Sequence, residues 1–125
     1  MAAIETVIDT NRRFTVHTIK GEVSPEEISN KIKTYSESGP TDLILWDFSE
    51  ADLCNITLGH VETFISLTNQ YSKYRNSGKT AFVFSSDLGF GLGRIFDSRL
   101  DLMDSKIPYM TFRSKEDALM WLFNQ

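Results

Sequence analysis

Three glycines alternate with other residues in one short segment of the chain, at Gly89, Gly91 and Gly93. They follow the apolar run at residues 79–84 and precede a helical pattern, which predicts a glycine-rich turn from a strand into a helix. In open α/β sheets such turns lie at the carboxyl ends of the strands, where ligands usually bind, and glycine permits positive φ and close backbone approach. Backbone N–H groups at such a turn can hold an anion, with Arg94 as the counter-charge.

Two interpretations of this segment stay open. In the first, it is the site that binds a ligand or partner, formed by Leu88, Phe90, Gly91, Leu92, Gly93 and Arg94. In the second, which we favour, the glycines only shape a tight turn, the apolar residues pack inward, and Arg94 pairs with Asp97. The segment is not a nucleotide-binding loop, because it lacks a Gly-Lys-Ser/Thr sequence and Arg94 stands where a dinucleotide fingerprint has its last glycine.

Four carboxylates lie near the ends of two predicted strands, at Asp47, Glu50, Asp52 and Asp87. Because the carboxyl ends of parallel strands meet at one edge of a sheet, these side chains should gather there, and carboxylate oxygens are the ligands that Mg²⁺ prefers. The alternative is a set of ordinary loop acids in water, with Asp47 capping its own turn. We expect the second arrangement, and therefore neither a metal nor a cofactor.

Cys54 and His60 are the side chains most easily drawn as a nucleophile and its base. That chemistry needs a lowered thiol pKa, an oriented imidazole and an oxyanion site, and the chain carries no nucleophile-elbow motif. We therefore expect a partly buried cysteine and a histidine at the start of a helix. His17 lies mid-strand and is expected to be a packed or edge side chain rather than a base. The protein is predicted not to be an enzyme.

The composition suits a single domain over residues 1–125, because 41% of the residues are hydrophobic and no linker or repeat interrupts the chain. The formal net charge is -4 and the basic residues are scattered, which argues against binding to nucleic acid. No apolar run approaches the length of a membrane span, and the N-terminus lacks the features of a signal peptide, so we expect a cytoplasmic protein. The one cysteine excludes an intramolecular disulfide.

Hydrophobic periodicity predicts strands that alternate with helices along the chain. The strands are expected at residues 4–9, 14–20, 42–48, 79–84 and 108–113. The first helix is expected between an N-cap at Ser24 and the breaker Gly39-Pro40, with Pro25 in its first turn and Glu27 completing a capping box; the others are expected at 58–76, 93–104 and 115–124. The order ββαβαβαβα predicts an α/β fold with a mostly parallel five-stranded sheet, an antiparallel N-terminal edge strand and helices on its faces.

The last helix is apolar on more sides than one docking surface requires, through Ala118, Leu119, Met120, Trp121, Leu122 and Phe123. A helix that is apolar all round is either buried or meets a partner. One interpretation is a homodimer formed through Leu119, Met120 and Phe123. The other is a deeply buried core helix anchored by Trp121.

Four segments together carry a resemblance to a known family: residues 21–27, Leu45-Trp46-Asp47, residues 90–96 and the ending at residues 112–122. On these residues, the pattern from Phe14 to Phe123 resembles the small STAS-type domains related to bacterial anti-sigma-factor antagonists, and specifically their uncharacterised stand-alone relatives. It implies a STAS-like fold and a non-catalytic binding domain. Relatives of similar fold in the CRAL-TRIO lipid-transfer group suggest an apolar ligand.

Signalling members of that group carry an Asp-Ser-Ser/Thr-Gly phosphorylation motif at the start of the second helix. The corresponding sequence here is Asn55-Ile56-Thr57-Leu58-Gly59, in which only Thr57 offers a hydroxyl as a phosphoacceptor. Together these features predict a binding or regulatory module that engages a protein partner or a small apolar ligand near the carboxyl ends of the strands. The alternative is a weak Mg²⁺- or anion-dependent enzyme that uses the acids at those ends.

Overall fold

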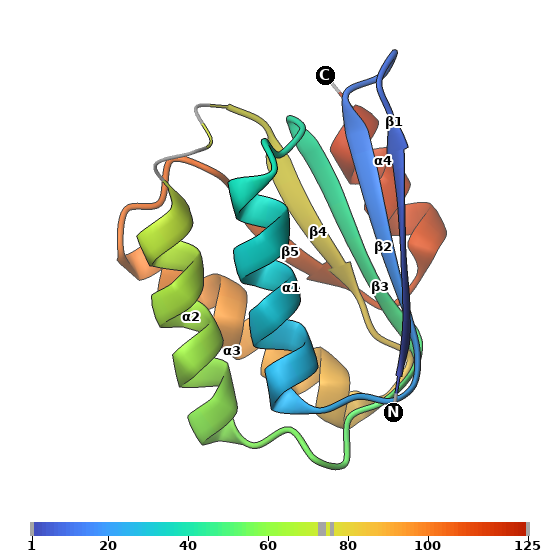
Figure 1. Cartoon of the computed structure of the whole chain (residues 1–125), viewed down its shortest axis with the longest axis vertical. Helices are drawn as coiled ribbons and strands as arrows, with labels where there is room; N and C mark the ends of the chain where they lie inside the picture. Colours follow the sequence, from blue (N-terminus) through green and yellow to red (C-terminus); the bar gives the residue numbers. More distant parts are fainter. Residues whose placement is uncertain (1, 73–74, 76, 125) are drawn as a thin grey trace.

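The computed structural model describes residues 2–72, 75 and 77–124, which form a five-stranded sheet with helices on both faces (Figure 1). The strands are β1 (Ala3–Asp9), β2 (Phe14–Glu22), β3 (Leu43–Asp52), β4 (Lys79–Val83) and β5 (Tyr109–Phe112). The helices are α1 (Pro25–Glu37), α2 (Leu58–Tyr71), α3 (Asp87–Leu102) and α4 (Lys115–Phe123).

The strands lie in the sheet in the order in which they occur in the sequence, with β3 at the centre (Figure 1). β1 runs antiparallel to β2, and each later pair of neighbours is parallel. The predicted α/β class, element order and antiparallel N-terminal edge strand are therefore confirmed. Each parallel pair is connected through a helix, because parallel strands need a crossover between them.

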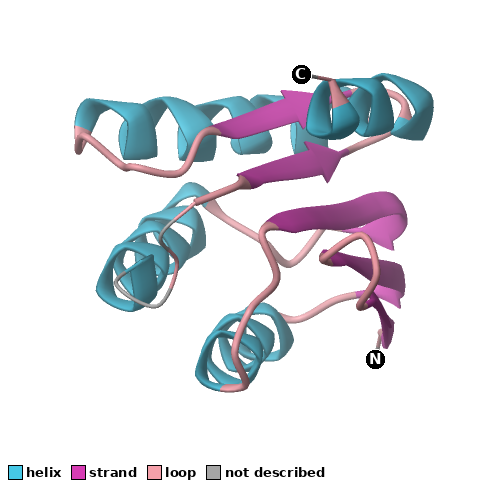
Figure 2. Cartoon of the chain, turned by 90° about the horizontal axis from the view of Figure 1, so that it is seen from above, coloured by secondary structure: helices cyan, strands magenta, loops and turns pink. Residues whose placement is uncertain are grey.

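Helices α1, α2 and α3 cover one face of the sheet and α4 covers the other (Figure 2). Two hydrophobic clusters follow this division. The larger cluster, on the face of α1–α3, includes Ile19, Trp46, Phe64, Phe82 and Leu100. The smaller cluster, under α4, includes Phe14, Leu45, Ala81, Val83 and Leu122. Because three helices share one face of the sheet, that face has the larger interior.

Local sequence signals explain where the first two helices begin and where α1 ends. Glu27 N donates a hydrogen bond to Ser24 Oγ at 3.1 Å, and Ser24 N donates one to Glu27 Oε1 at 2.9 Å, so the predicted capping box is confirmed. Thr57 and His60 form the same reciprocal arrangement at the start of α2. Gly39 has a φ of 91° just after α1, a conformation that glycine adopts without strain.

Helix α3 begins at Asp87, so the predicted turn that delayed this helix to Gly93 is wrong. Gly89 N donates a hydrogen bond to the N-cap side chain at 3.0 Å. Gly89 and Gly93 allow close packing of the helix against Phe84. A Cβ on Gly93 would lie 2.6 Å from Phe84 Cε2, and one on Gly89 would lie 2.7 Å from Phe84 Cδ1. Contacts of this length are not tolerated between carbon atoms. The glycines therefore let α3 approach the end of β4.

Two other boundaries differ from the prediction by more than two residues. β3 continues to Asp52 instead of ending at Phe48, because its last residues pair with the end of β2 beyond an irregularity in the register. Helix α2 ends at Tyr71, and the predicted continuation to residue 76 falls partly outside the described residues.

Helix α4 is only partly buried, so it is not the deeply buried helix that one interpretation expected. Ala118 and Leu122 are buried, Leu119 and Phe123 are half-buried, and Met120 is 65% exposed. None of the helices in the described part of the chain has both the length and the apolar character needed to cross a membrane.

Candidate functional site

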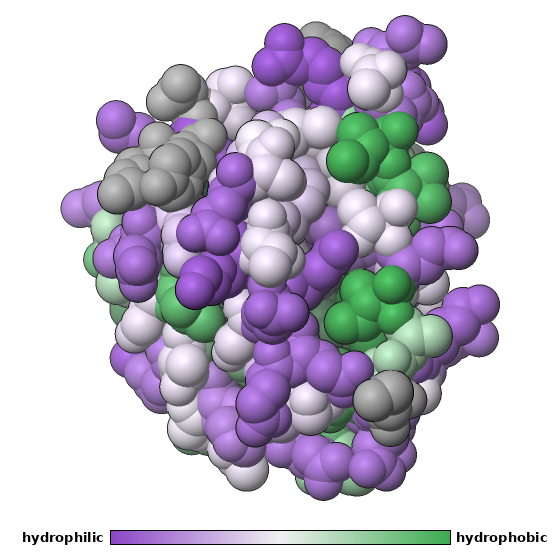
Figure 3. Space-filling model, in the orientation of Figure 1, coloured by the Kyte–Doolittle hydropathy of each residue, from purple (hydrophilic) through white to green (hydrophobic). Residues whose placement is uncertain are grey.

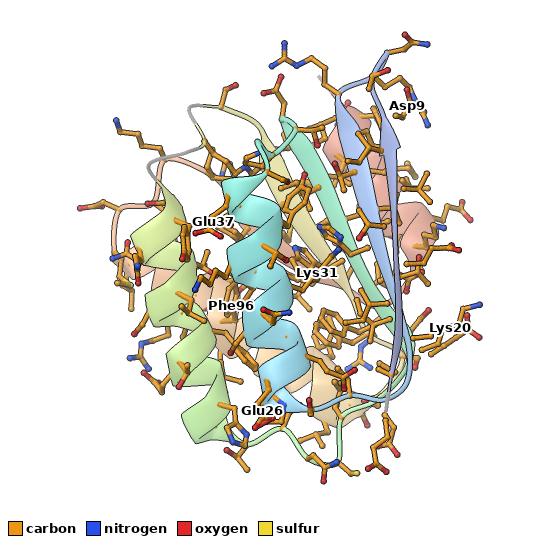
Figure 4. The ribbon with its side chains drawn as sticks, in the orientation of Figure 1. Asp9, Lys20, Glu26, Lys31, Glu37 and Phe96 are labelled. Atoms are coloured by element: carbon orange, nitrogen blue, oxygen red, sulfur yellow. The ribbon has the colours of Figure 1, made fainter. Side chains whose placement is uncertain are left out.

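A cavity of about 120 Å³ lies between the sheet and helices α1–α3, and we call it the helix-side cavity. Its sheet wall is formed by Ile44, Trp46, Phe48, Thr80, Phe82, Phe84 and Tyr109. Its helix wall includes Ile28, Ile32, Tyr35, Val61, Phe64, Thr68, Leu92 and Phe96, and Figure 4 labels Phe96 where it is seen between α1 and α2. Most of these side chains are apolar or aromatic, which is the lining typical of a small-molecule site.

Aromatic rings dominate the sheet wall of the cavity. The rings of Trp46 and Phe48 are stacked at 6.1 Å with an interplanar angle of 7°, and Phe48 stacks on Phe84 at 5.0 Å. Phe82 meets Phe96 of α3 edge to face at 5.2 Å. Both arrangements are favoured by the ring quadrupole and fix the side chains beyond what burial alone would do. The wall is therefore a well-defined apolar surface.

The end of the cavity near the start of β4 contains a guanidinium group. Arg75 donates hydrogen bonds to Thr80 Oγ1 and to the backbone oxygen of Asp42, the latter at 2.8 Å. Its Nε atom is buried without a hydrogen-bond partner among the described residues. Burial lowers the pKa of Arg75, and the adjacent Tyr109 opposes that shift. Both Arg75 and Tyr109 line the cavity, so this end is polar.

The residues predicted from the glycine-rich segment divide between the cavity and the surface. Leu92 and Gly93 line the cavity. Gly91, Arg94 and Leu88 are exposed, and the exposed fraction of Leu88 is 58%.

Phe90, from the same segment, is half-buried and lies beneath two cationic side chains. The guanidinium carbon of Arg113 lies 4.1 Å from the Phe90 ring centre, and that of Arg94 lies 6.0 Å from it. Arg94 also pairs with Asp97 at 4.0 Å, as the favoured interpretation expected. The glycine-rich segment is thus the first part of α3, with one side facing the cavity and the other facing solvent.

Thr57 is exposed and caps the start of α2. His60 N donates to Thr57 Oγ1 at 3.3 Å, and Thr57 N donates to His60 Nδ1 at 3.0 Å. The imidazole is therefore bound to its own helix cap and not to Cys54. Cys54 is exposed rather than partly buried, and the adjacent Asp52 raises the pKa of its thiol. A raised pKa disfavours the thiolate, which a nucleophilic cysteine needs.

The four carboxylates predicted to gather at one edge of the sheet have separate partners. Asp47 is buried and accepts hydrogen bonds from the backbone N and the side chain of Ser49, at 3.0 and 2.6 Å. Glu50 faces Lys20 at 3.7 Å, and Asp87 pairs with Arg113 at 2.8 Å.

The prediction that these acids gather is wrong because β3 runs on to Asp52, which leaves Asp47 inside the strand. Among the described residues, the group with metal-ligating spacing is instead Glu22, Asp52 and Cys54, all exposed, with ligand atoms within 4.8 Å of one another. Exposed acids at this spacing are common in loops, and here Asp52 Oδ1 also accepts a local hydrogen bond from Cys54 N at 3.0 Å.

Comparison with solved structures identifies the fold of this chain. An uncharacterized protein of the DUF3478 family from Shewanella loihica PV-4, described as having a SpoIIAA-like fold, aligns with a TM-score of 0.59 and 17% identity over 97% of this chain and 93% of that one. The anti-sigma factor antagonist SpoIIAA in its unphosphorylated form aligns with a TM-score of 0.51 and 19% identity over 98% of this chain and 100% of that one. The chain has a SpoIIAA-like fold.

An anti-sigma factor antagonist from Mycobacterium paratuberculosis has the same SpoIIAA-like fold, with a TM-score of 0.54 and 15% identity over 96% of this chain and 94% of that one. Comparison of the sequence with protein-family models and with curated proteins returned no match. The resemblance to STAS-type domains is thus confirmed at the level of the fold.

Two cavity residues of this SpoIIAA-like domain were not identified from the sequence. Arg75 lies in the last turn of the predicted second helix and belongs to no motif, and Tyr109 resembles any aromatic residue of a strand. The sequence does show a cationic residue at a predicted helix end, a few residues before an apolar strand. That signal is too common to identify a site without the three-dimensional arrangement.

Proposed function

We propose that this protein is a non-catalytic regulatory module that binds a small apolar ligand in the helix-side cavity. The observation that carries the proposal is the lining of the cavity, where aromatic and aliphatic side chains from the sheet and three helices surround one space. The cavity reaches Phe48 and Phe84, which lie just beyond the last residue pair of β3 with β4, and this is close to the region that the sequence favoured. Ligand pockets are commonly apolar spaces of this kind with a few polar groups.

The size of the cavity limits the ligand. An apolar cavity of about 150 Å³ stays dry and binds benzene. The helix-side cavity, at about 120 Å³, therefore suits a short alkyl chain or a single ring in this conformation. A long lipid tail would need the helices to move apart.

The test is a calorimetric titration with the neutral probe 1-octanol. We expect saturable binding to the wild-type protein and a loss of at least about tenfold in affinity for Val61→Phe, which fills the cavity from α2. Ser66→Phe, on an exposed position of the same helix, is the matched control and should bind like wild type. Ile32→Phe repeats the test from α1 if Val61→Phe melts at a much lower temperature. Absence of saturable binding to the wild-type protein contradicts the proposal.

A protein partner is the second candidate, favoured by the outer side of α3. Leu88, Ile95 and Leu102 are spaced seven residues apart and are 58%, 38% and 81% exposed. Apolar side chains at heptad spacing fit one face of another helix. Leu88→Ser and Arg94→Ala should each reduce capture of the partner without lowering the melting temperature, whereas Met120→Ser, on the other side of the sheet, should not. Equal capture by all three variants argues against this surface.

The homodimer through α4 stays a proposal, centred on Met120 with half-buried Leu119 and Phe123 beside it. Sedimentation at micromolar concentration should show a dimer that Met120→Glu dissociates, and a monomer at high concentration would exclude it. We also propose a cytoplasmic location, because the exposed thiol of Cys54 is best kept reduced there.

A further inference from the structure

Arg75 lacks a counter-ion of the kind that a partly buried guanidinium usually has. Its hydrogen bonds go to neutral groups, namely the hydroxyl of Thr80, the phenol of Tyr109 and the backbone oxygens of Asp42 and Lys79. The carboxylate of Asp42, whose backbone oxygen accepts from Arg75, is paired with Arg13 at 2.8 Å. None of the ion pairs formed by the described side chains includes Arg75.

A buried charge without a partner is costly, and the cost is removed when an anion binds. Arg75 is the only charged residue among the described residues that line the helix-side cavity. Its Nε–H is buried and has no acceptor among the described residues, so a donor at the cavity wall remains available. Tyr109, which lines the cavity beside Arg75 and accepts a hydrogen bond from it, keeps a phenol O–H that can act as a second donor.

The accessible end of the cavity is the end at which Arg75 lies. Ser36, Pro40, Ser72 and Arg75 line the cavity and are half-buried. The lining residues at the other end, including Phe48, Leu53 and Ile56, are buried. A ligand with one charged end and one apolar end would therefore enter with its chain first and keep its charge near solvent and near the guanidinium.

We propose that the ligand is an aliphatic monocarboxylate of short to medium chain length, whose carboxylate pairs with Arg75 and whose chain occupies the helix-side cavity. This proposal rests on the proposed function, because it assumes that the cavity takes an apolar chain. A carboxylate matches a guanidinium better than other small anions do, because two oxygens can face two N–H groups. The volume of about 120 Å³ sets the short chain length.

The test compares octanoate with 1-octanol, which has the same chain and no charge. Calorimetric titrations of the wild-type protein should show octanoate binding more tightly. In Arg75→Met, octanoate affinity should fall by about tenfold or more, as expected for loss of a charge-assisted hydrogen bond, while octanol affinity stays within about twofold. Arg12→Met is the matched control, because Arg12 is exposed in the turn between β1 and β2 and does not line the cavity. It should leave both affinities unchanged.

The outcomes separate the two proposals. If neither probe binds the wild-type protein, the proposed function fails and this inference fails with it. If octanol binds and octanoate binds no better, or if Arg75→Met weakens both probes equally, the cavity binds apolar molecules but Arg75 does not select a carboxylate. Should Arg75→Met fail to fold, octanoate labelled with ¹³C at its carboxyl group decides on the wild-type protein alone. Its carboxyl pKa should be lower when bound than when free, and an unchanged or raised pKa overturns the inference.

Discussion

Thr6 on the edge strand and His17 in the neighbouring strand share a hydrogen bond, with 2.9 Å between Thr6 Oγ1 and His17 Nδ1. His17 is fully buried, as the sequence led us to expect of a packed side chain, and its Nε2 has no partner among the described residues. The ring lies against Tyr35 at 4.4 Å and Trp46 at 4.2 Å between centres. Burial lowers the pKa of His17 to about 3, with a smaller effect from Lys31, which Figure 4 labels on α1.

This pKa predicts that the protein loses stability in mild acid. Since His17 binds a proton in the unfolded chain below about pH 6.5 but in the folded chain only near pH 3, the unfolded state takes up more protons in between. The free energy of unfolding should therefore fall by up to about 1.4 kcal/mol for each pH unit below 6. Urea denaturation at about pH 7 and at about pH 5 measures the loss of stability.

The control for this prediction is His17→Phe, which keeps a ring at the position and removes the titrating group. Its unfolding free energy should vary much less between these two pH values. Carboxylates such as Asp9 and Glu27, whose pKa values are lowered by their hydrogen-bond partners, contribute only at lower pH. A wild-type protein whose stability does not change over this interval would show that His17 is not buried in its neutral form.

Replacing two glycines of α3 by alanine is predicted to have opposite effects on stability. Gly91→Ala should stabilise the protein by up to about 1 kcal/mol, because a Cβ there has nothing within 4 Å and alanine favours the helix. Gly93→Ala should destabilise it by about 1 to 3 kcal/mol, because the Cβ would lie 2.6 Å from Phe84 and 2.8 Å from Thr111. Thermal melting of both variants measures the difference. Similar melting temperatures would mean that α3 does not pack as closely as described.

Among these substitutions, truncation of Trp46 is expected to cause the largest loss of stability. It lies in the central strand, is 8% exposed and forms part of the cavity wall. Trp46→Ala should lower the free energy of unfolding by about 3 to 5 kcal/mol, since it enlarges a cavity that the surrounding helices cannot close. Urea denaturation measures the loss. A loss below about 1 kcal/mol would mean that the site repacks freely.

The fold was predictable because its signals are local. Ser24, Pro25 and Glu27 define a helix start within four residues, and the apolar run at 43–48 indicates a central strand. The start of α3 was misplaced because glycine has a low helix propensity and alternate glycines suggest a turn. Here tertiary contacts with Phe84 outweigh that propensity. The serine at position 86, which caps α3, was the local signal that the glycines obscured.

The site was less predictable, because the side chains of a cavity are the same residue types as those of a core. Trp46, Phe64 and Phe82 would be apolar whether the helices close on the sheet or leave a space above it. Figure 3 shows that the outer surface is a mixture of hydrophilic and hydrophobic residues, with apolar groups near β1 that are unrelated to the cavity; the exposed side chains there include Val7 and Ile8. Only the distances between α1, α2, α3 and the sheet distinguish a filled core from a binding site.

Methyl NMR of the protein during titration with 1-octanol tests the central claim most directly. Methyl groups of Ile28, Val61 and Leu92, which come from three different helices and line the cavity, should shift together and saturate with one dissociation constant. Those of Val7 and Ile8, exposed on β1, should not move. Saturable shifts confined to the first group are the result that the account predicts. No shift there, or shifts only on β1, would contradict it.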